Sequence, residues 1–289
     1  MHFAFVILHY KTKQDTIDCI ESIKKLPTTE TISIVVVDNA SNNGSIEDIE
    51  AAYSSDSCMY FVHNESNMGF ARGNNVGYAY AKKLNPDFIL ILNNDIIIDS
   101  DNVLNEIVKC YNDYSFSVLG PDIVSLVDQG HQNPPAPTPL DLKILRKRIS
   151  RYKLLRFLNR FHVYGLFHKL FGNKNRVVNI RDKCVDYKQN VQLHGSFLVF
   201  SRNYFVNEKY AFNPQTFLYT EEPILFDHCL KKGYITLYCP SISVFHKEDS
   251  STNAVYKADY EKRNFVFDNL IKSYKVLYRQ IKDNIEEWD

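Results

Sequence analysis

The first hundred residues alternate between strand-like and helix-like segments, and this alternation restricts the fold more than any other feature of the sequence. Apolar runs at residues 3–8, 32–37, 59–63 and 88–92 are typical of buried strands. Apolar residues at helical spacing predict intervening helices over residues 13–26, 45–53 and 71–84. Buried strands that alternate with helices predict an α/β fold with a parallel, doubly wound sheet.

Polar side chains follow three of the predicted strands. They are His9, the run from Asp38 to Ser41, and the run from Asn93 to Asp95. Because the carboxyl ends of parallel strands meet at one edge of a sheet, where such sheets bind ligands, we expect a ligand site at this edge. The chain has no P-loop motif, and no GxGxxG follows its first strand, so these two nucleotide-binding patterns are excluded.

Two glycines, one within the third predicted helix and one just before it, have distinct expected roles. Gly77 is expected to allow close packing of the helix against the sheet, because it has no side chain. Gly69 is expected to form the turn that leads into the helix.

The formal charge of the chain is zero, but its charges are unevenly distributed. Residues 142–181 contain twelve Lys and Arg and no Asp or Glu, whereas the rest of the chain has 22 basic and 34 acidic residues. Apolar residues in this segment recur at spacings of three and four, which predicts a basic amphipathic helix. Two interpretations stay open: the apolar stripe packs on the core, or the helix contacts an anionic membrane surface. The balanced total charge argues against a nucleic-acid partner.

Several features favour a cytoplasmic location. The apolar run at residues 3–8 is far shorter than the roughly 18–20 residues that span a bilayer, and it lacks the flanking regions of a signal peptide. None of the six Cys belongs to a CxxC pair, which fits reduced thiols. Residues 256–285 have helical spacing, and they leave three packing partners open: the core, a second copy of the chain in a homodimer, and the membrane.

Seven ordered segments carry a resemblance to a known family. They are VILHY at 6–10, VVVDNAS at 35–41, NMGFARGNNVG at 67–77, LNND at 92–95, GSF at 195–197, YTEE at 219–222 and FH at 245–246. Together they resemble the family 2 nucleotide-sugar glycosyltransferases, in particular their rhamnosyltransferase-like branch. The resemblance implies a GT-A fold, in which a Rossmann-like, mostly parallel sheet with flanking helices carries the basic amphipathic helical insertion and C-terminal helices.

The resemblance assigns metal and donor contacts to particular residues. Asp95 would supply a carboxylate to Mg²⁺ or Mn²⁺, hard cations that prefer oxygen ligands, and His246 would be a second ligand. Asp38 would accept a hydrogen bond from the base or ribose of a nucleoside-diphosphate sugar. The further donor contacts are expected to be His9, Asn39, Ser41, Asn67, Arg72, Asn75, Asn94 and Gly195.

The acidic pair Glu221 and Glu222 is the candidate catalytic group. Transfer with inversion needs one base to take the proton of the acceptor hydroxyl, and the second acid of the pair is the usual base in the resembled family. Glu221 would orient the base or the acceptor. Ile224 departs from the family pattern, which commonly has Asp there. Acids also favour a helix N-terminus, and Pro223 suits a first turn, so a capping role is compatible.

The expected function is therefore inverting, metal-dependent transfer of a sugar from a UDP- or dTDP-sugar to a glycan or polyprenyl-diphosphate-linked glycan in bacterial surface polysaccharide synthesis. We expect a nucleotide-sugar-binding half at residues 1–120, an acceptor-binding half at 121–250 with the basic insertion at 140–181, and a C-terminal helical segment at 251–289. The alternatives are a non-catalytic nucleotide-sugar-binding protein and a sugar nucleotidyltransferase. The latter needs a Gly-rich phosphate loop after the first strand, which residues 9–14 lack.

Overall fold

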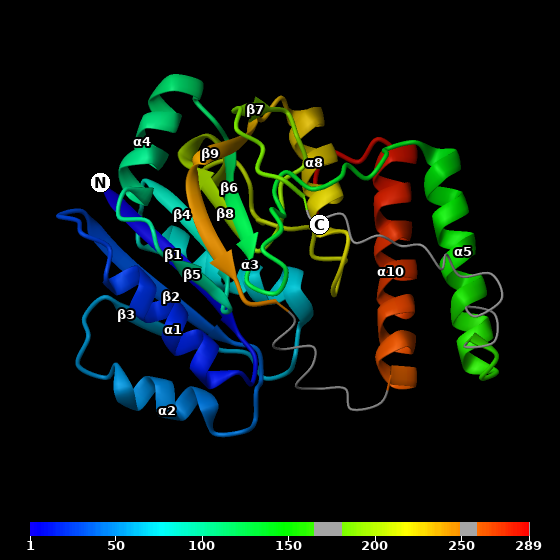
Figure 1. Ribbon diagram of the computed structural model, residues 1–289, viewed down its shortest axis with the longest axis horizontal. Coiled ribbons are helices and arrows are strands. Elements are labelled where there is room, and N and C mark those ends of the chain that lie inside the picture. The colour runs from blue at the N-terminus through cyan, green and yellow to red at the C-terminus, as the bar shows by residue number, and fades with distance from the viewer. Residues whose placement is uncertain (165–180, 249–258, 289) are drawn as a thin grey trace.

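The computed structural model describes residues 1–164, 181–248 and 259–288. A mixed sheet with the strand order β3–β2–β1–β4–β8–β6–β9–β5 forms its centre, and β7 pairs with β9 (Figure 1). The bounds of the strands are His2–His9 for β1, Thr31–Asp38 for β2, Met59–His63 for β3, Phe88–Asn93 for β4, Ile96–Ile98 for β5, Val118–Ser125 for β6, Lys188–Gln189 for β7, Phe197–Ser201 for β8 and Thr236–His246 for β9.

The first four strands are parallel, as the sequence predicts. The second half of the sheet is mixed, because β8 runs antiparallel to both β4 and β6, and β5 and β7 run antiparallel to β9. Strand β6 is parallel to β9, so the carboxyl ends of β1, β4, β6 and β9 all reach the same edge of the sheet. We call this edge the carboxyl edge.

Helices cover both faces of the sheet and bury two separate apolar clusters, one on each face. Helices α1, α2 and α4 contribute to the first cluster, and α3, α5, α8 and α10 contribute to the second. The bounds of the helices are Lys13–Lys24 for α1, Ser45–Ala52 for α2, Gly69–Lys83 for α3, Val103–Tyr114 for α4, Leu142–Arg160 for α5, Arg202–Phe205 for α7, Glu221–Lys232 for α8 and Asp259–Lys282 for α10.

Both glycine predictions for α3 are confirmed. A Cβ atom on Gly77 would lie 2.3 Å from Cγ1 of Val6 and 2.8 Å from Cγ2 of Val37, so the helix packs directly on β1 and β2. Gly69 has a φ of +78°, a value that glycine adopts at little cost. A Cβ atom there would lie 2.3 Å from the carbonyl oxygen of Phe217, which couples the start of α3 to the chain just before α8.

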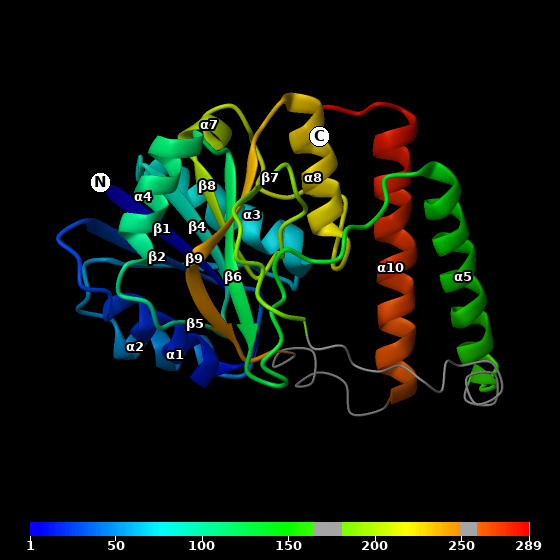
Figure 2. The ribbon, with the colours of Figure 1, turned by 45° about the horizontal axis from the view of Figure 1, so that its top comes forward.

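Helices α5 and α10 pack along each other beside the sheet (Figures 1 and 2). The Tyr152 and Tyr274 rings stack 5.8 Å apart, and an Arg148 Nη1 donates to the Tyr274 hydroxyl at 2.9 Å. The amide of Gln280, on α10, donates to a carboxylate oxygen of Asp227, on α8, at 2.8 Å. The described part of the basic segment is thus helical as expected, but α5 ends at Arg160, and residues 165–180 of the expected continuation lie outside the described residues.

Neither α5 nor any other helix within the described ranges combines the length and the apolar character that crossing a bilayer requires.

Candidate functional site

The carboxyl edge brings together candidate residues that are far apart in the sequence. In the β1–β2 ladder His9 lies opposite Asp38, and in the β6–β9 ladder Ser125 lies opposite His246. The backbone N–H of Asn93, at the end of β4, donates to the Ser196 carbonyl at 2.9 Å. Strand pairing therefore brings the segments that contain Asp38, Asp95, Gly195 and His246 to one edge of the sheet.

Asp95 and His246 form a two-residue cluster with the features of a cation site. His246 Nε2 lies 3.2 Å from Asp95 Oδ1, and both side chains are more than nine-tenths buried. The Oδ1 atom is buried and accepts no hydrogen bond from the described residues. His246 Nδ1 lies 2.8 Å from Gln132 Oε1, which can only accept, so Nδ1 carries a proton and Nε2 is the ring nitrogen that faces Asp95.

These two residues fit a hard divalent cation that keeps open positions for other ligands. A buried carboxylate oxygen that accepts no hydrogen bond from the described residues, beside an imidazole nitrogen, offers two ligands, and Mg²⁺ is commonly held by one or two carboxylates together with phosphate oxygens and water. Among the described residues, no three His, Cys, Asp or Glu side chains are grouped for a metal ion. A cation at this pair would thus depend on a ligand to complete its coordination.

The acidic pair lies in the first turn of α8, and the backbone before it is unusual. Tyr219 and Thr220 both have a φ of +71°, a region that costs roughly 1–2 kcal/mol for a residue other than glycine. Glu222 is half-buried and packs on the backbone of Gly195, where a Cβ atom would lie 3.1 Å from Glu222 Oε1. The close approach of the carboxylate therefore depends on a glycine at position 195.

His194 connects the acidic pair with the cation pair. Its ring lies 5.9 Å from the His246 ring, edge to face, and its Nδ1 is 2.9 Å from the Ser196 hydroxyl. Burial is the main cause that lowers the pKa of His194 to about 4, and the nearby Arg181 adds to the effect, so the ring is neutral at pH 7. Since Gly195 is the next residue, the segment 194–196 places Glu222 and Asp95 around the same short stretch of backbone.

The two carboxyl groups of the pair have different surroundings. Burial and the neighbouring charge of Glu222 raise the pKa of Glu221 to about 8, and its Oε1 atom has no hydrogen-bond partner among the described residues. Burial also raises the pKa of Glu222, but hydrogen bonds from backbone N–H groups, including that of Gly195, oppose the rise. At pH 7 the proton of the pair is thus held mainly by Glu221, which leaves the more exposed Glu222 as the better base.

Asp38 and Ser41 form a tight turn after β2. The Ser41 hydroxyl donates to Asp38 Oδ1 at 2.6 Å, and the Ser41 backbone N–H also points to this carboxylate. His9 lies beneath them with no exposed surface, and its Nδ1 and Nε2 are each 2.7 Å from the hydroxyl groups of Thr16 and Ser45. Both ring nitrogens of His9 are thus engaged within the protein, so a contact with a donor, which stays a prediction, would require one of these hydrogen bonds to be exchanged.

Two of the expected donor contacts, Asn39 and Asn75, use their side-chain amides for hydrogen bonds within the protein. Asn39 donates to Asn67 Oδ1 at 3.1 Å and accepts from the Met68 N–H at 2.9 Å, which fixes the turn before α3. Asn75 donates to the Phe212 carbonyl at 2.7 Å and accepts from two backbone N–H groups at 3.0 Å. Both side chains are nearly fully buried, so their direct contact with a donor is not supported.

Three other residues expected to contact the sugar-nucleotide donor, Asn67, Arg72 and Asn94, have polar groups that could still reach a ligand. Asn67 is exposed. Arg72 is exposed too, and its Nε donates to the Pro214 carbonyl at 2.7 Å. Asn94 is buried, and its amide nitrogen lies 2.7 Å from the Thr12 hydroxyl and 3.0 Å from that of Thr16, while no described residue donates a hydrogen bond to its side-chain oxygen.

Sequence reasoning did not identify Gln132 and His194 as site residues. Gln132 lies just before the Pro-rich stretch at 134–139 and belongs to no recognisable motif. Its contact with His246 arises from the pairing of β6 with β9, across 114 positions of the chain. His194 directly precedes the GSF segment at 195–197, and only this neighbouring position in the sequence could have suggested that it belongs to the site.

Comparison with known proteins identifies the family of this chain. The model of the family described as "Glycosyl transferase family 2" matches residues 4–179, more than half of the chain. The low-salt glycan biosynthesis hexosyltransferase Agl10 of Haloferax volcanii is 24% identical over 247 residues, which are 85% of this chain and 67% of that protein.

The fold is also similar to that of solved structures. A crystal structure of S. aureus TarS 1–349 has a TM-score of 0.51 and 14% identity, over 98% of this chain and 73% of that one. A second TarS structure, in complex with UDP, has the same TM-score and identity and covers 98% of this chain and 72% of that one. A third, with UDP-GlcNAc, has a TM-score of 0.51 and 13% identity, over 97% and 73%. The likeness supports the expected GT-A architecture, and the family match shows that the chain belongs to glycosyl transferase family 2 and is a glycosyltransferase.

Proposed function

We propose that this glycosyltransferase is an inverting, divalent-metal-dependent enzyme that moves a sugar from a UDP- or dTDP-sugar to a hydroxyl group of a glycan acceptor. The observation that carries the proposal is the meeting of the Glu221–Glu222 pair with the Asp95–His246 pair around residues 194–196. A single-displacement transfer needs a base on one side of the anomeric carbon and charge neutralisation on the other. Both groups are present within one edge of the sheet.

The cation pair would serve the leaving group. Asp95 and His246 would hold Mg²⁺ or Mn²⁺, which when bound neutralises negative charge on the departing diphosphate. Gln132 keeps the His246 ring in the tautomer that directs Nε2 toward this position. Arg72, which is exposed and fixed through its Nε, would contact the diphosphate or the sugar through its remaining donors.

Glu222 would act as the base. Its carboxylate takes the proton of the acceptor hydroxyl while that oxygen bonds to the anomeric carbon and the bond from this carbon to the diphosphate oxygen breaks. One displacement of this kind inverts the anomeric configuration and releases a nucleoside diphosphate. Glu221, protonated at pH 7, would orient the base or the acceptor.

The nucleotide would lie over the carboxyl ends of the first strands. Asp38 is held by Ser41 in an orientation that keeps a carboxylate at this edge, where it would accept from the base or ribose. Asn67 and the side-chain oxygen of Asn94 are the other candidate contacts. The TarS structures with UDP and UDP-GlcNAc, which share the fold, support a uridine nucleotide as the first donor to test.

The acceptor would be a glycan or a polyprenyl-diphosphate-linked glycan, and the pathway would be bacterial surface polysaccharide synthesis. The name of the Haloferax relative, a glycan biosynthesis hexosyltransferase, supports a glycan product. The basic segment 142–181 would place the enzyme on the anionic cytoplasmic face of a membrane. We also propose that residues 1–120 bind the nucleotide sugar, that residues 121–250 bind the acceptor, and that residues 251–289 form a separate C-terminal segment.

The deciding experiment compares Glu222→Gln with the wild type. We expect unchanged binding of the donor in the presence of Mn²⁺, measured by calorimetry, and a fall of about 10²–10⁴-fold in transfer to a glycan acceptor. Glu30→Gln, at the opposite edge of the sheet, is the matched control and should retain full transfer. Retained transfer by Glu222→Gln would exclude this residue as the base. The NMR coupling constant of the anomeric proton in the product tests inversion directly.

A further inference from the structure

The outer face of α5 near its C-terminal end exposes a cluster of large apolar side chains. The exposed fractions are 50% for Leu154, 57% for Phe157, 60% for Phe161 and 41% for Val163. The Phe157 and Phe161 rings lie 4.6 Å apart, so they form one continuous apolar surface. We call these four residues the α5 tip.

The α5 tip does not result from a loosely attached end of the chain. The Asn159 amide donates to the Tyr260 carbonyl at 3.1 Å and to Asn264 Oδ1 at 2.9 Å, and the His162 ring stacks on the Tyr260 ring at 4.6 Å. These contacts fix the buried side of α5 to α10. The opposite side, which carries Phe157 and Phe161, is therefore held outward by ordered packing.

Basic residues surround the apolar cluster. Helix α5 has eight Lys and Arg and no acidic residue, and Lys153 and Arg160 are exposed next to the α5 tip. Helix α10 contributes three acidic residues: Asp268, which pairs with Arg156 at 2.6 Å, and Asp259 and Glu261 in the first turn. Helix α10 itself carries six basic residues against these three acids, so the helix pair stays strongly positive.

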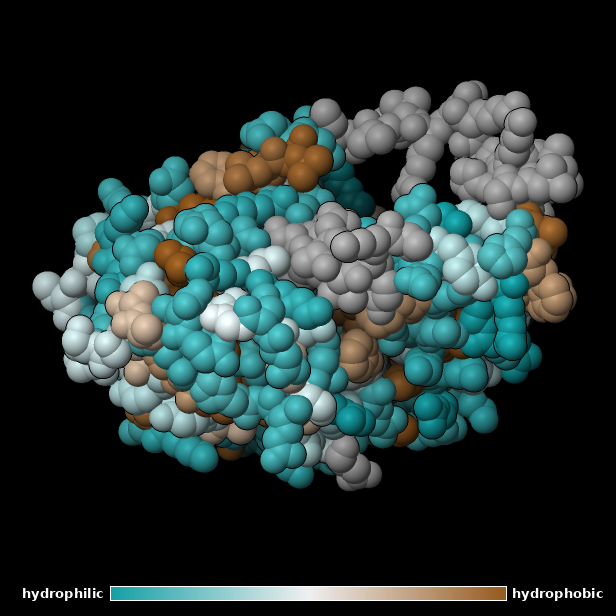
Figure 3. Space-filling model, turned by 90° about the horizontal axis from the view of Figure 1, so that it is seen from below, coloured by the Kyte–Doolittle hydropathy of each residue, from teal (hydrophilic) through white to brown (hydrophobic). Residues whose placement is uncertain are grey.

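The α5 tip also faces the same way as the candidate site. In Figures 1 and 2 the C-terminal end of α5 points toward the side of the molecule that the carboxyl ends of β6 and β9 reach. Figure 3 views this side, and apolar surface lies at the edge of the molecule over α5. One flat surface could therefore contact the α5 tip and lie next to the carboxyl edge at the same time.

We propose that the α5 tip inserts into the headgroup and acyl boundary of an anionic bilayer, while the surrounding Lys and Arg contact lipid phosphates. An exposed aromatic cluster with a basic rim is the pattern of helices that bind membrane interfaces. A second copy of this chain would bring an equally positive helix pair against the first, which disfavours a dimer through this face. The inference rests on the proposed membrane location. It names the residues that bind the membrane, and it orients the enzyme so that the carboxyl edge faces the bilayer and meets an acceptor carried by a lipid.

The main experiment is flotation of the full chain with vesicles of phosphatidylcholine alone or mixed with phosphatidylglycerol. We expect binding to the anionic vesicles, and a loss of at least about tenfold in the partition coefficient for the double variant Phe157→Ser, Phe161→Ser. The matched control, Val206→Ser with Leu230→Ser, removes two exposed apolar side chains on other elements and should bind as the wild type does. Lys153→Glu with Arg160→Glu should weaken binding and reduce its dependence on salt.

A second measurement reports insertion itself. Trp288 is the single tryptophan of the chain and is 8% exposed, so Phe157→Trp adds a distinguishable fluorophore at the surface. We expect a blue shift on addition of anionic vesicles and quenching by brominated acyl chains. Unchanged emission, equal binding of the Phe157→Ser, Phe161→Ser variant, or a vesicle-independent dimer that this variant abolishes would each overturn the proposal.

These experiments distinguish a failure of the membrane proposal from a failure of the proposed function. Donor binding and transfer to a water-soluble acceptor need no vesicles, and both should be unchanged in the Phe157→Ser, Phe161→Ser variant. Normal transfer without membrane binding overturns the membrane inference alone, whereas membrane binding without transfer overturns the proposed function alone.

Discussion

Replacing Glu221 by Gln should stabilise the protein at neutral and alkaline pH. Burial and the charge of Glu222 raise the pKa of Glu221 to about 8 from its ordinary value of 4.5, so the folded state binds this proton more tightly than the unfolded state does. The stabilisation from the bound proton is fully present below pH 4.5 and is lost as the pH rises through 8. Gln resembles the protonated acid in shape but cannot ionise, so the variant avoids this loss.

The size of the effect follows from the two pKa values. Each pKa unit corresponds to about 1.4 kcal/mol, so ionisation of Glu221 costs at most about 3 kcal/mol of the free energy of unfolding at pH 7 and about 5 kcal/mol above pH 8. Urea unfolding of both proteins from pH 4 to 9 measures the difference. We expect equal stabilities near pH 4 and a gap that widens steadily up to pH 8, with a melting temperature roughly 5–10 °C higher for the variant at pH 7.

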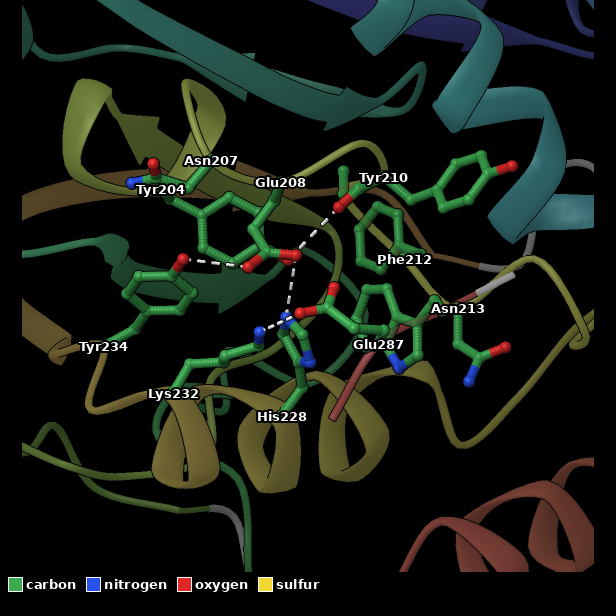
Figure 4. A network of polar contacts seen from close by, with 12 residues as sticks. Tyr204, Asn207, Glu208, Tyr210, Phe212, Asn213, His228, Lys232, Tyr234 and Glu287 are labelled. Carbon is green, nitrogen blue, oxygen red and sulfur yellow. Dashed lines mark hydrogen bonds and ion pairs between the residues drawn. The ribbon is translucent and has the colours of Figure 1, made fainter. Parts of the chain in front are cut away.

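Glu208→Gln is the control, because it makes the same chemical change at another buried acid of this chain. We expect it to lower the free energy of unfolding, whereas Glu221→Gln should raise it. Burial alone would raise the pKa of Glu208, but contact with His228 and the Tyr234 hydroxyl outweighs burial and lowers it (Figure 4). His228 Nε2 lies 3.0 Å from Glu208 Oε2, and the Tyr234 hydroxyl donates to Glu208 Oε1 at 2.8 Å.

The Glu208 carboxylate thus contributes stability that is present above its ordinary pKa and lost as the pH falls through the lowered value. Its replacement should cost about 1–3 kcal/mol at pH 7, since an amide takes the place of the carboxylate that contacts His228 and the Tyr234 hydroxyl. The reasoning about Glu221 would be refuted if Glu221→Gln had the same pH dependence of unfolding as the wild type, or if it were less stable at pH 8.

Three further substitutions have defined expectations. Gln132→Leu removes the group that fixes the His246 tautomer, and Mn²⁺-dependent donor binding, measured by calorimetry, should weaken about 10–100-fold with an unchanged melting temperature. Gly77→Ala places a methyl group 2.3 Å from Val6 Cγ1 and should cost about 1–3 kcal/mol in urea unfolding. Gly69→Ala puts its methyl group 2.3 Å from the Phe217 carbonyl oxygen, so it should reduce transfer as well as stability; a loss of stability alone would show that α8 does not depend on this contact.

Much of the first half of the molecule could be predicted from the sequence. The strands at 3–8, 32–37, 59–63 and 88–92 and the helices between them follow from local periodicity, and the structure has all of them within a few residues. The joint placement of Asp38 and Asp95 follows too, because parallel strands joined by crossover helices must end at one edge. The family resemblance added positions 222 and 246, which periodicity alone does not single out.

Tertiary structure decided which of these polar side chains remain available to a ligand. Asn75 is bonded to Phe212, 137 positions away, and His9 is bonded to Thr16 and Ser45, and neither pairing leaves a trace in the local pattern. Tertiary packing likewise buried Leu145 in the second apolar cluster and left Phe157 exposed, although both are apolar residues of α5. A sequence pattern reflects the conformation that a segment prefers by itself. A hydrogen-bond partner or an exposed face depends instead on which distant segment packs against it. For this chain the fold of the first half could therefore be predicted from the sequence, whereas the availability of its polar side chains to a ligand could not.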